Sequence, residues 1–258
     1  MFSERVDSAD DRFISGAREV GAVTETLDPE AVFWDIGGVI VQLESIQSGH
    51  RDFVESLLDA YRSPLPPAEA LDTWRSVLGE YFRGGEGNEY LTAREGYRRA
   101  TDAILAGDAS ETDWEERFRR IHDEHASANP DAVETIERLA ETDLHVGVIS
   151  DVDHEEGQRL LATFGVDQHF DSFTTSEEVG LKKPDPEIFE TALAKAGVDG
   201  SAAIMIGDRY ANDMEGGKAV GMTTVAYGAD EGPAVDHQVG DLRELLALLS
   251  IEEPSAQN

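Results

Sequence analysis

Several acidic residues and a serine come at the end of short apolar runs or directly after a glycine in the sequence. Asp35 ends the apolar run at 31–34, Ser150-Asp151 ends a second run, and Gly207-Asp208 is followed five residues later by Asp213. Two or three carboxylates with a backbone carbonyl suit a hard octahedral cation that keeps some waters, hence Mg²⁺. A hydroxyl beside free backbone N–H groups can hold an anionic oxygen. A remaining carboxylate can attack phosphorus and form an aspartyl-phosphate.

Strands and helices must bring these residues together. Apolar runs that read as strands lie at 31–35, 144–150, 170–174, 202–206 and 223–226, and helical patterns lie at 131–141, 154–164, 187–196, 212–220 and 242–249. Alternating β and α units predict a doubly wound, Rossmann-like α/β fold, with a parallel sheet covered on both faces. In such a sheet the site lies outside the carboxyl ends of the strands. The segment that contains Lys183 follows the third strand and reaches the same edge.

The pattern becomes helical between the first strand and the rest of the α/β units. Apolar residues such as Phe53, Leu57 and Tyr61 recur at helical spacing, and Pro-rich and Gly-rich clusters divide the block into four helices. We therefore predict an acidic extension over 1–28, an α/β core over 29–48 and 127–258, and an inserted four-helix cap over 49–126. A helical cap over strand ends can exclude water from a reaction.

The charge balance excludes several kinds of partner. The chain has 54 acidic and 21 basic residues, a formal net charge of −33, and no cysteine. Such a surface repels nucleic acid and anionic membranes. No apolar run of 18 residues is present, which argues against a membrane span, and the cytoplasm is the simplest compartment. The excess of acid is typical of a protein adapted to molar salt, where the Debye length is ~3 Å; an ordinary acidic protein is the alternative. No pattern points to a particular oligomeric state.

Four motifs in order make the sequence resemble the haloacid dehalogenase superfamily. They are Val32-Phe-Trp-Asp-Ile-Gly-Gly-Val-Ile40, Val146-Gly-Val-Ile-Ser150, Lys183-Pro-Asp-Pro186 and Gly207-Asp-Arg-Tyr-Ala-Asn-Asp213. The resemblance spans about residues 31–228. It implies a phosphatase that uses Mg²⁺ to hydrolyse a small phosphorylated metabolite. A 2-haloacid dehalogenase, which needs no metal, and a catalytically weak binding or regulatory protein are the alternatives.

The resemblance also implies a role for each motif residue. Asp35 is the expected nucleophile and a Mg²⁺ ligand, and Lys183 is expected to steady the phosphoryl group. The expected substrate-binding residues are Ser150 and Asp151. The other expected Mg²⁺ ligands are Asp208, Asp213 and the carbonyl of Gly37, although a role as N-cap of a helix that begins at 214 explains Asp213 nearly as well.

Gly37 departs from the pattern of the superfamily. Its phosphatases usually carry a second aspartate two residues after the nucleophile, which serves as general acid and base. A backbone carbonyl at Gly37 can still bind metal, but glycine cannot deliver a proton. General acid catalysis contributes ~10²–10⁴-fold, so a slower enzyme, an easier leaving group or another proton donor is implied.

Two other groups look functional but favour surface roles. His122 and His125 stand three residues apart in a predicted helix with Glu124 between them, a pattern typical of a solvated face. Three arginines, Arg94, Arg98 and Arg99, could contact an anionic substrate or pair with surface carboxylates.

Overall fold

Six parallel strands form one sheet. The computed structural model describes residues 27–251, so the predicted extension over 1–28 lies almost wholly outside the described residues. The strand order is β3-β2-β1-β4-β5-β6. The strands are β1 (Ala31–Trp34), β2 (His145–Ser150), β3 (Ser172–Thr175), β4 (Ala203–Gly207), β5 (Thr223–Tyr227) and β6 (His237–Val239). The sheet confirms the doubly wound α/β prediction. The sequence analysis missed β6, because an edge strand of three residues leaves no apolar run.

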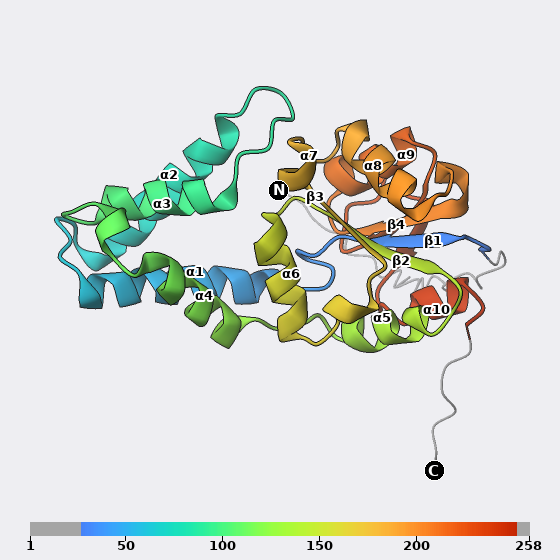
Figure 1. Cartoon of the computed structure of the whole chain (residues 1–258), viewed down its shortest axis with the longest axis horizontal. Helices are drawn as coiled ribbons and strands as arrows, with labels where there is room; N and C mark the ends of the chain where they lie inside the picture. Colours follow the sequence, from blue (N-terminus) through green and yellow to red (C-terminus); the bar gives the residue numbers. More distant parts are fainter. Residues whose placement is uncertain (1–26, 252–258) are drawn as a thin grey trace, which may run out of the picture.

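Helices cover both faces of the sheet (Figure 1). Along β1, Val32 and Trp34 belong to one buried cluster, while Ala31 and Phe33 belong to another. This alternation follows from the two-residue period of a strand, which sends successive side chains to opposite faces. The first cluster is shared with α5 (Ala132–Ala140), α6 (His154–Thr163) and α10 (Glu244–Leu248), and the second with α8 (Pro186–Ala196). Two short helices, α7 (Ser176–Val179) and α9 (Glu215–Ala219), lie on the same side as α8.

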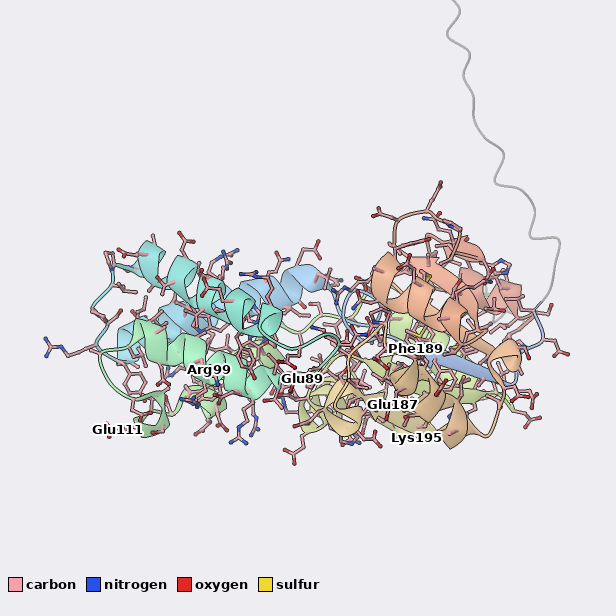
Figure 2. All side chains as sticks on the ribbon, turned by 90° about the horizontal axis from the view of Figure 1, so that it is seen from above. Glu89, Arg99, Glu111, Glu187, Phe189 and Lys195 are labelled. Carbon is pink, nitrogen blue, oxygen red and sulfur yellow. The ribbon has the colours of Figure 1, made fainter. Side chains whose placement is uncertain are left out.

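Four helices form a separate unit beside the core, which we call the helical unit. They are α1 (Leu43–Ala60), α2 (Pro67–Arg83), α3 (Ala93–Ile104) and α4 (Trp114–His125). The unit has its own buried cluster, which includes Phe53, Trp74 and Phe118. Figure 2 shows the unit and the core from above, with Glu89 at their junction. None of the helices within residues 27–251 combines the length and the apolar character needed to cross a bilayer.

The first helix of this unit starts earlier than the periodicity predicts. Helix α1 runs without a break from Leu43 to Ala60, so the predicted division between residues 48 and 49 falls inside it. Serines and a glycine in its first two turns are weak helix formers and hide the helical signal. A Cβ at Gly49 would lie 3.1 Å from the ring of His122, so glycine lets α1 approach α4 closely.

Candidate active site

A rigid turn after β1 holds Asp35 at the carboxyl edge of the sheet. The backbone N–H of Asp35 donates to Ile206 O at 3.0 Å, which continues the pairing of β1 with β4. Downstream, the side-chain amide of Asn129 donates to the carbonyls of Gly38 (2.7 Å) and Val39 (2.8 Å). Asp35 is only 5% exposed. Its carboxylate is therefore fixed in position before any ligand binds.

The two glycines of this turn have different reasons to be glycine. Gly38 has φ +81°, and a Cβ there would lie 1.9 Å from Oδ2 of Asp208, so no other residue fits without displacing that carboxylate. A Cβ at Gly37 would meet nothing within 4 Å, and the backbone there is not left-handed. Gly38 is thus a steric requirement of the site, whereas Gly37 leaves room for a side chain.

Ser150 and Lys183 both contact one oxygen of Asp35. The Ser150 hydroxyl donates to Asp35 Oδ1 at 2.8 Å, and Lys183 Nζ lies 2.9 Å from the same atom. Lys183 Nζ also lies 2.6 Å from Asp213 Oδ1 and donates to Ile149 O at 3.1 Å. Among the described residues, none donates a hydrogen bond to Oδ2 of Asp35. One oxygen is therefore anchored, and the other is available to a substrate or a cation.

Asp151 positions the lysine segment. Its Oδ1 accepts hydrogen bonds from the backbone N–H of Lys183 (2.8 Å) and the hydroxyl of Ser176 (2.7 Å). Its Oδ2 accepts a longer bond from Asn212 Nδ2 at 3.4 Å. The residue also lines the main cavity. Both oxygens of its carboxylate thus accept hydrogen bonds from the protein. Any contact with an anionic substrate would therefore come from the backbone of Asp151.

Asp213 lies on an irregular turn and not at the start of a regular helix. The helix predicted over 212–220 is a single π-helical turn (Tyr210–Met214) followed by the short α9, whose N-cap is Met214. Asp213 is fully buried, and its Oδ2 accepts from Arg209 N at 3.0 Å. The alternative of a helix-capping Asp213 is therefore wrong. Such turns are frequent at functional sites, and no periodic signal in the sequence reveals them.

Three carboxylates form a group that suits a divalent cation. One oxygen each from Asp35, Asp208 and Asp213 lies within 4.8 Å of the others. Oδ1 of Asp208 is buried and has no hydrogen-bond partner among residues 27–251. Hard oxygen donors of this kind fit Mg²⁺. The carbonyl of Gly37, the other predicted ligand, belongs to the turn directly after Asp35.

The electrostatics of the group call for additional positive charge. Burial raises the pKa of Asp35 to about 7; the nearby Lys183 opposes this shift and Asp213 adds to it. Burial and Asp213 together raise the pKa of Asp208 to about 6. Burial alone would lower the pKa of Lys183, but Asp213, Asp35 and Asp151 together raise it above its ordinary value. Lys183 is therefore charged, and a cation would stabilise the ionised carboxylates around it.

The sequence profile of the haloacid dehalogenase-like hydrolases matches residues 29–221. The chain belongs to this family. A ribulose-1,5-bisphosphate 5-phosphatase from Halopiger xanaduensis is 30% identical over 173 residues, which cover 62% of this chain and 69% of that protein. A glyceraldehyde 3-phosphate phosphatase from Pyrococcus abyssi is 36% identical over 98 residues, 38% of this chain, and the match spans only 41% of that relative. A crystal structure of a haloacid dehalogenase-family phosphatase from Thermococcus onnurineus aligns with 86% of this chain and 99% of its own, with a TM-score of 0.69 at 25% identity.

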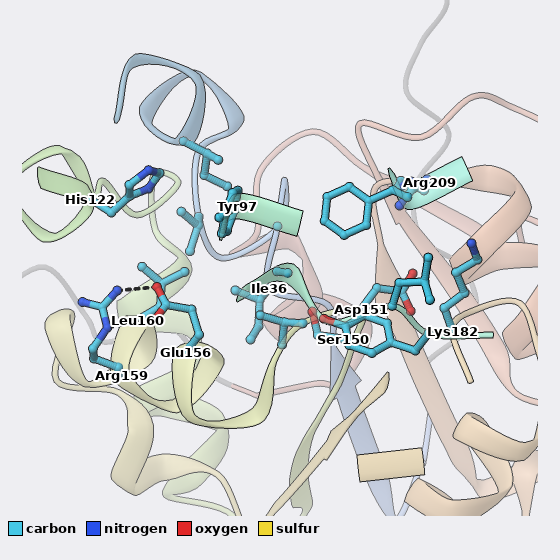
Figure 3. A pocket seen from close by; sticks show the side chains of 18 of the residues that line it. Ile36, Tyr97, His122, Ser150, Asp151, Glu156, Arg159, Leu160, Lys182 and Arg209 are labelled. Carbon is cyan, nitrogen blue, oxygen red and sulfur yellow. Dashed lines mark hydrogen bonds and ion pairs between the residues drawn. The ribbon is translucent and has the colours of Figure 1, made fainter. Parts of the chain in front are cut away.

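A cavity of about 640 Å³ connects the active site of this hydrolase to the helical unit. Figure 3 shows Ser150 and Asp151 at one end and His122 at the other, with Ile36 between them. His122 stacks on Phe118 with ring centroids 3.9 Å apart, and its Nε2 is buried. The prediction that His122 faces solvent is therefore wrong. Phe118 lies one turn earlier in the same helix, whereas His50 and Gly49 of α1, which also pack against the ring, are distant in the sequence.

A carboxylate from the core caps a helix of the helical unit. Asp153 accepts hydrogen bonds from the Tyr90 hydroxyl (2.7 Å) and from the backbone N–H groups of Ala93 and Arg94 (both 2.8 Å). These two N–H groups belong to the first turn of α3, whose N-cap residue Thr92 makes no side-chain cap. In the sequence, Asp153 stands just before the helix predicted over 154–164, where an acidic residue is common. Its true partners lie about sixty positions away, beyond any local pattern.

Backbone pairing adds a second contact between the core and the helical unit. Tyr90 N donates to Gly180 O at 2.9 Å, and Lys182 N donates to Asn88 O at 2.8 Å. The segment that joins α2 to α3 is thus tied to the loop that carries Lys183. Together with Asp153, this pairing holds the helical unit over the cavity.

Proposed function

We propose that this hydrolase is a Mg²⁺-dependent phosphatase that acts on a small phosphorylated metabolite through an aspartyl-phosphate on Asp35. One observation carries the proposal. Ser150 and Lys183 hold Oδ1 of Asp35, Oδ2 accepts no hydrogen bond from a described residue, and Asp35 shares an acidic group with Asp208 and Asp213. The curated relatives named above act on ribulose-1,5-bisphosphate and glyceraldehyde 3-phosphate, which supports a phosphorylated substrate.

The residues divide the work as follows. Oδ2 of Asp35 attacks phosphorus, the bond from phosphorus to the leaving oxygen breaks, and water then hydrolyses the aspartyl-phosphate to free phosphate. Lys183 and Ser150 hold Asp35 in line and donate to the phosphoryl oxygens as these approach. Mg²⁺, held by Asp35, Asp208, Asp213 and the Gly37 carbonyl, would supply positive charge to the transferring group.

The acidic group favours this reaction over halide displacement. A metal-free dehalogenase has no need of Asp208, a further carboxylate beside its nucleophile whose Oδ1 is buried without a hydrogen-bond partner among residues 27–251. Burying such an oxygen costs free energy unless a cation compensates its charge. Gly37 carries no acid, so the reaction requires an easier leaving group or a proton donor from elsewhere.

The helical unit serves as a cap over the cavity. We extend the predicted cap, 49–126, to begin at Leu43, because α1 is one continuous helix. Its docking through Asp153 and the segment at 88–90 covers the route from the helical unit to Asp35. Closing the site in this way excludes water and strengthens the electrostatic contacts inside it.

The excess of acidic residues fits work in a salt-rich cytoplasm. A net charge of −33 makes the folded chain repel itself, and molar salt screens this repulsion. The Halopiger relative is in keeping with such a setting. Assays therefore need molar KCl.

Phosphate release from a panel of phosphorylated metabolites tests the proposal. In molar KCl with Mg²⁺, we expect release with at least one member, and loss of that activity when EDTA replaces Mg²⁺. Asp35→Asn should abolish release, while Asp59→Asn, at an exposed position of α1, should not. Rapid acid quench and mass spectrometry should locate a phosphoryl group on the peptide that contains Asp35. Absence of release across the panel, or full activity of Asp35→Asn, would show that the proposal is wrong.

A further inference from the structure

Three basic side chains that line the cavity have no ion-pair partner. Most basic side chains elsewhere in residues 27–251 form ion pairs with carboxylates. Arg94 contacts Glu115, and both Arg98 and Arg99 contact Glu95, which agrees with the predicted alternative of pairing with surface carboxylates. Within the described part of the chain, Arg83, Lys182 and Arg209 have no carboxylate within 4.0 Å, and all three line the cavity. A chain with 54 acidic and 21 basic residues offers many carboxylates to each cation. Arg83, Lys182 and Arg209 are therefore available to an anion that enters the cavity.

Two of these cations flank the reacting groups. Arg209 directly follows Asp208, and its charge lowers the pKa of that carboxyl group against the effect of burial. Lys182 directly precedes the buried Lys183 and is held by its backbone bond to Asn88. Figure 3 shows Lys182 and Arg209 at the same end of the cavity as Ser150 and Asp151.

The third cation comes from the helical unit. Arg83 ends α2, and its guanidinium folds back over Gly79, which also lines the cavity. The cations thus reach the cavity from the core and from the helical unit. The fourth cation of the cavity, Arg159, lies at the other end and contacts Glu156 and Asp123, so its charge is already compensated.

We propose that the substrate carries a second anionic group, a phosphate or a carboxylate, which Arg83, Lys182 and Arg209 bind. This inference rests on the proposed phosphatase function. The phosphoryl group that is transferred already meets Lys183, Ser150 and the acidic group with its cation. Arg83 and Arg209 are exposed and Lys182 is partly buried, so water solvates them in the free enzyme and an anionic ligand can reach them. An anionic leaving group compensates them through charge-assisted hydrogen bonds, and the planar guanidinium of arginine can make two such bonds at once.

Matched substrate pairs test the inference. One pair is a sugar bisphosphate and the corresponding monophosphate, and the other is 3-phosphoglycerate and glycerol 3-phosphate. At one fixed KCl concentration, we expect kcat/KM to be about tenfold or more higher for the member with the second anionic group, the size of one charge-assisted hydrogen bond. The two pairs separate a second phosphate from a carboxylate.

Variants assign the preference to particular residues. Arg83→Gln and Lys182→Gln should each reduce kcat/KM about tenfold for the doubly anionic substrates, and should leave the singly anionic ones nearly unchanged. Arg83→Lys keeps a charge and should recover part of the loss. Arg51→Gln on α1, an exposed arginine outside the cavity, is the matched control and should change neither. Arg209 is a poorer test because its loss would also disturb Asp208.

The outcomes separate this inference from the function on which it rests. No phosphate release from any substrate overturns the phosphatase proposal and the inference together. Release without a preference within either pair overturns the inference alone. A preference that survives in both Gln variants also overturns it, because the cations would then not be its cause. Thermal unfolding of each variant shows that it is folded, which is expected since Arg83 is exposed and Lys182 is only partly buried.

Discussion

Replacing Gly37 with aspartate should restore a general acid to the active site. The structure leaves space for it, because a Cβ at Gly37 meets nothing within 4 Å and the backbone there does not require glycine. Gly37 also lines the cavity, so a carboxyl group at this position would face a bound substrate. The substitution therefore changes the chemistry of the site without a change in its packing.

The expected gain follows from what a general acid contributes. Proton transfer by a positioned side chain accelerates a reaction by ~10²–10⁴-fold. The new carboxyl group would stand near the carboxylates of Asp35 and Asp208, and their charge favours its protonated form, which is the form that a general acid requires. We expect kcat for an alkyl phosphate to rise by about 10²-fold, the lower end of this range, because the site has not been optimised around an aspartate.

The dependence on the leaving group makes the experiment decisive. An alkyl phosphate needs a proton on its departing oxygen, whereas 4-nitrophenyl phosphate releases a stable anion. Gly37→Asp should therefore raise kcat for the alkyl phosphate much more than for the nitrophenyl ester. Gly37→Asn has nearly the same shape but cannot transfer a proton, and it should give no such gain. Equal gains for both substrates, or a gain in Gly37→Asn, would refute a role for proton delivery.

Three further perturbations follow from the contacts. Lys183→Met should lower the free energy of unfolding by about 3–5 kcal/mol, because it leaves carboxylates buried without their cation; an unchanged urea midpoint in Mg²⁺-free buffer would contradict this reasoning. Asp153→Asn should cost about 1 kcal/mol, as the loss of a helix cap does, and should speed amide hydrogen exchange in the first turn of α3 while exchange in the sheet stays constant. Burial lowers the pKa of His50 to about 4 and that of His122 to about 3 from an ordinary value of 6.5, so both rings are neutral in the folded state. The contribution of each neutral ring to the free energy of unfolding is complete above pH 6.5. As the pH falls below 6.5 this contribution is lost, by up to about 3 kcal/mol for each ring at pH 4. The difference in unfolding free energy between pH 7 and pH 4.5 should therefore be smaller in His122→Phe than in the wild type.

The strand-end residues could be predicted because two simple rules place them. An apolar run marks a buried strand, and a polar residue at its end marks the carboxyl edge. Asp35, Ser150 and Asp208 follow or end β1, β2 and β4, and in the structure these three strands are neighbours in one parallel sheet. A parallel sheet places all of these strand ends at the same edge, but only the strand order makes them neighbours. The structure brings them together, with Lys183 between Asp35 and Asp213.

Tertiary contacts set the features that the sequence analysis did not predict. Asp153 has the composition of an ordinary residue at the start of a helix, and only the fold shows that it caps α3 instead. Asn129 reads as the polar end of a loop, yet it fixes the turn after Asp35. The burial of His122 likewise depends on His50 and on the approach of α1 at Gly49. Periodicity reports which face of an element is apolar, but it does not report which distant element covers that face.

The adjacent glycines of the nucleophile turn show how this limit affects the interpretation of function. In the sequence Gly37 and Gly38 are indistinguishable, and a tight turn would explain both. In the structure only Gly38 is required, by its left-handed backbone and by the approach of Asp208. The missing acid at Gly37 is therefore not a consequence of packing. A site that can accommodate an aspartate but lacks one must rely on an easier leaving group or on another proton donor, so the choice of substrate and the missing acid are linked.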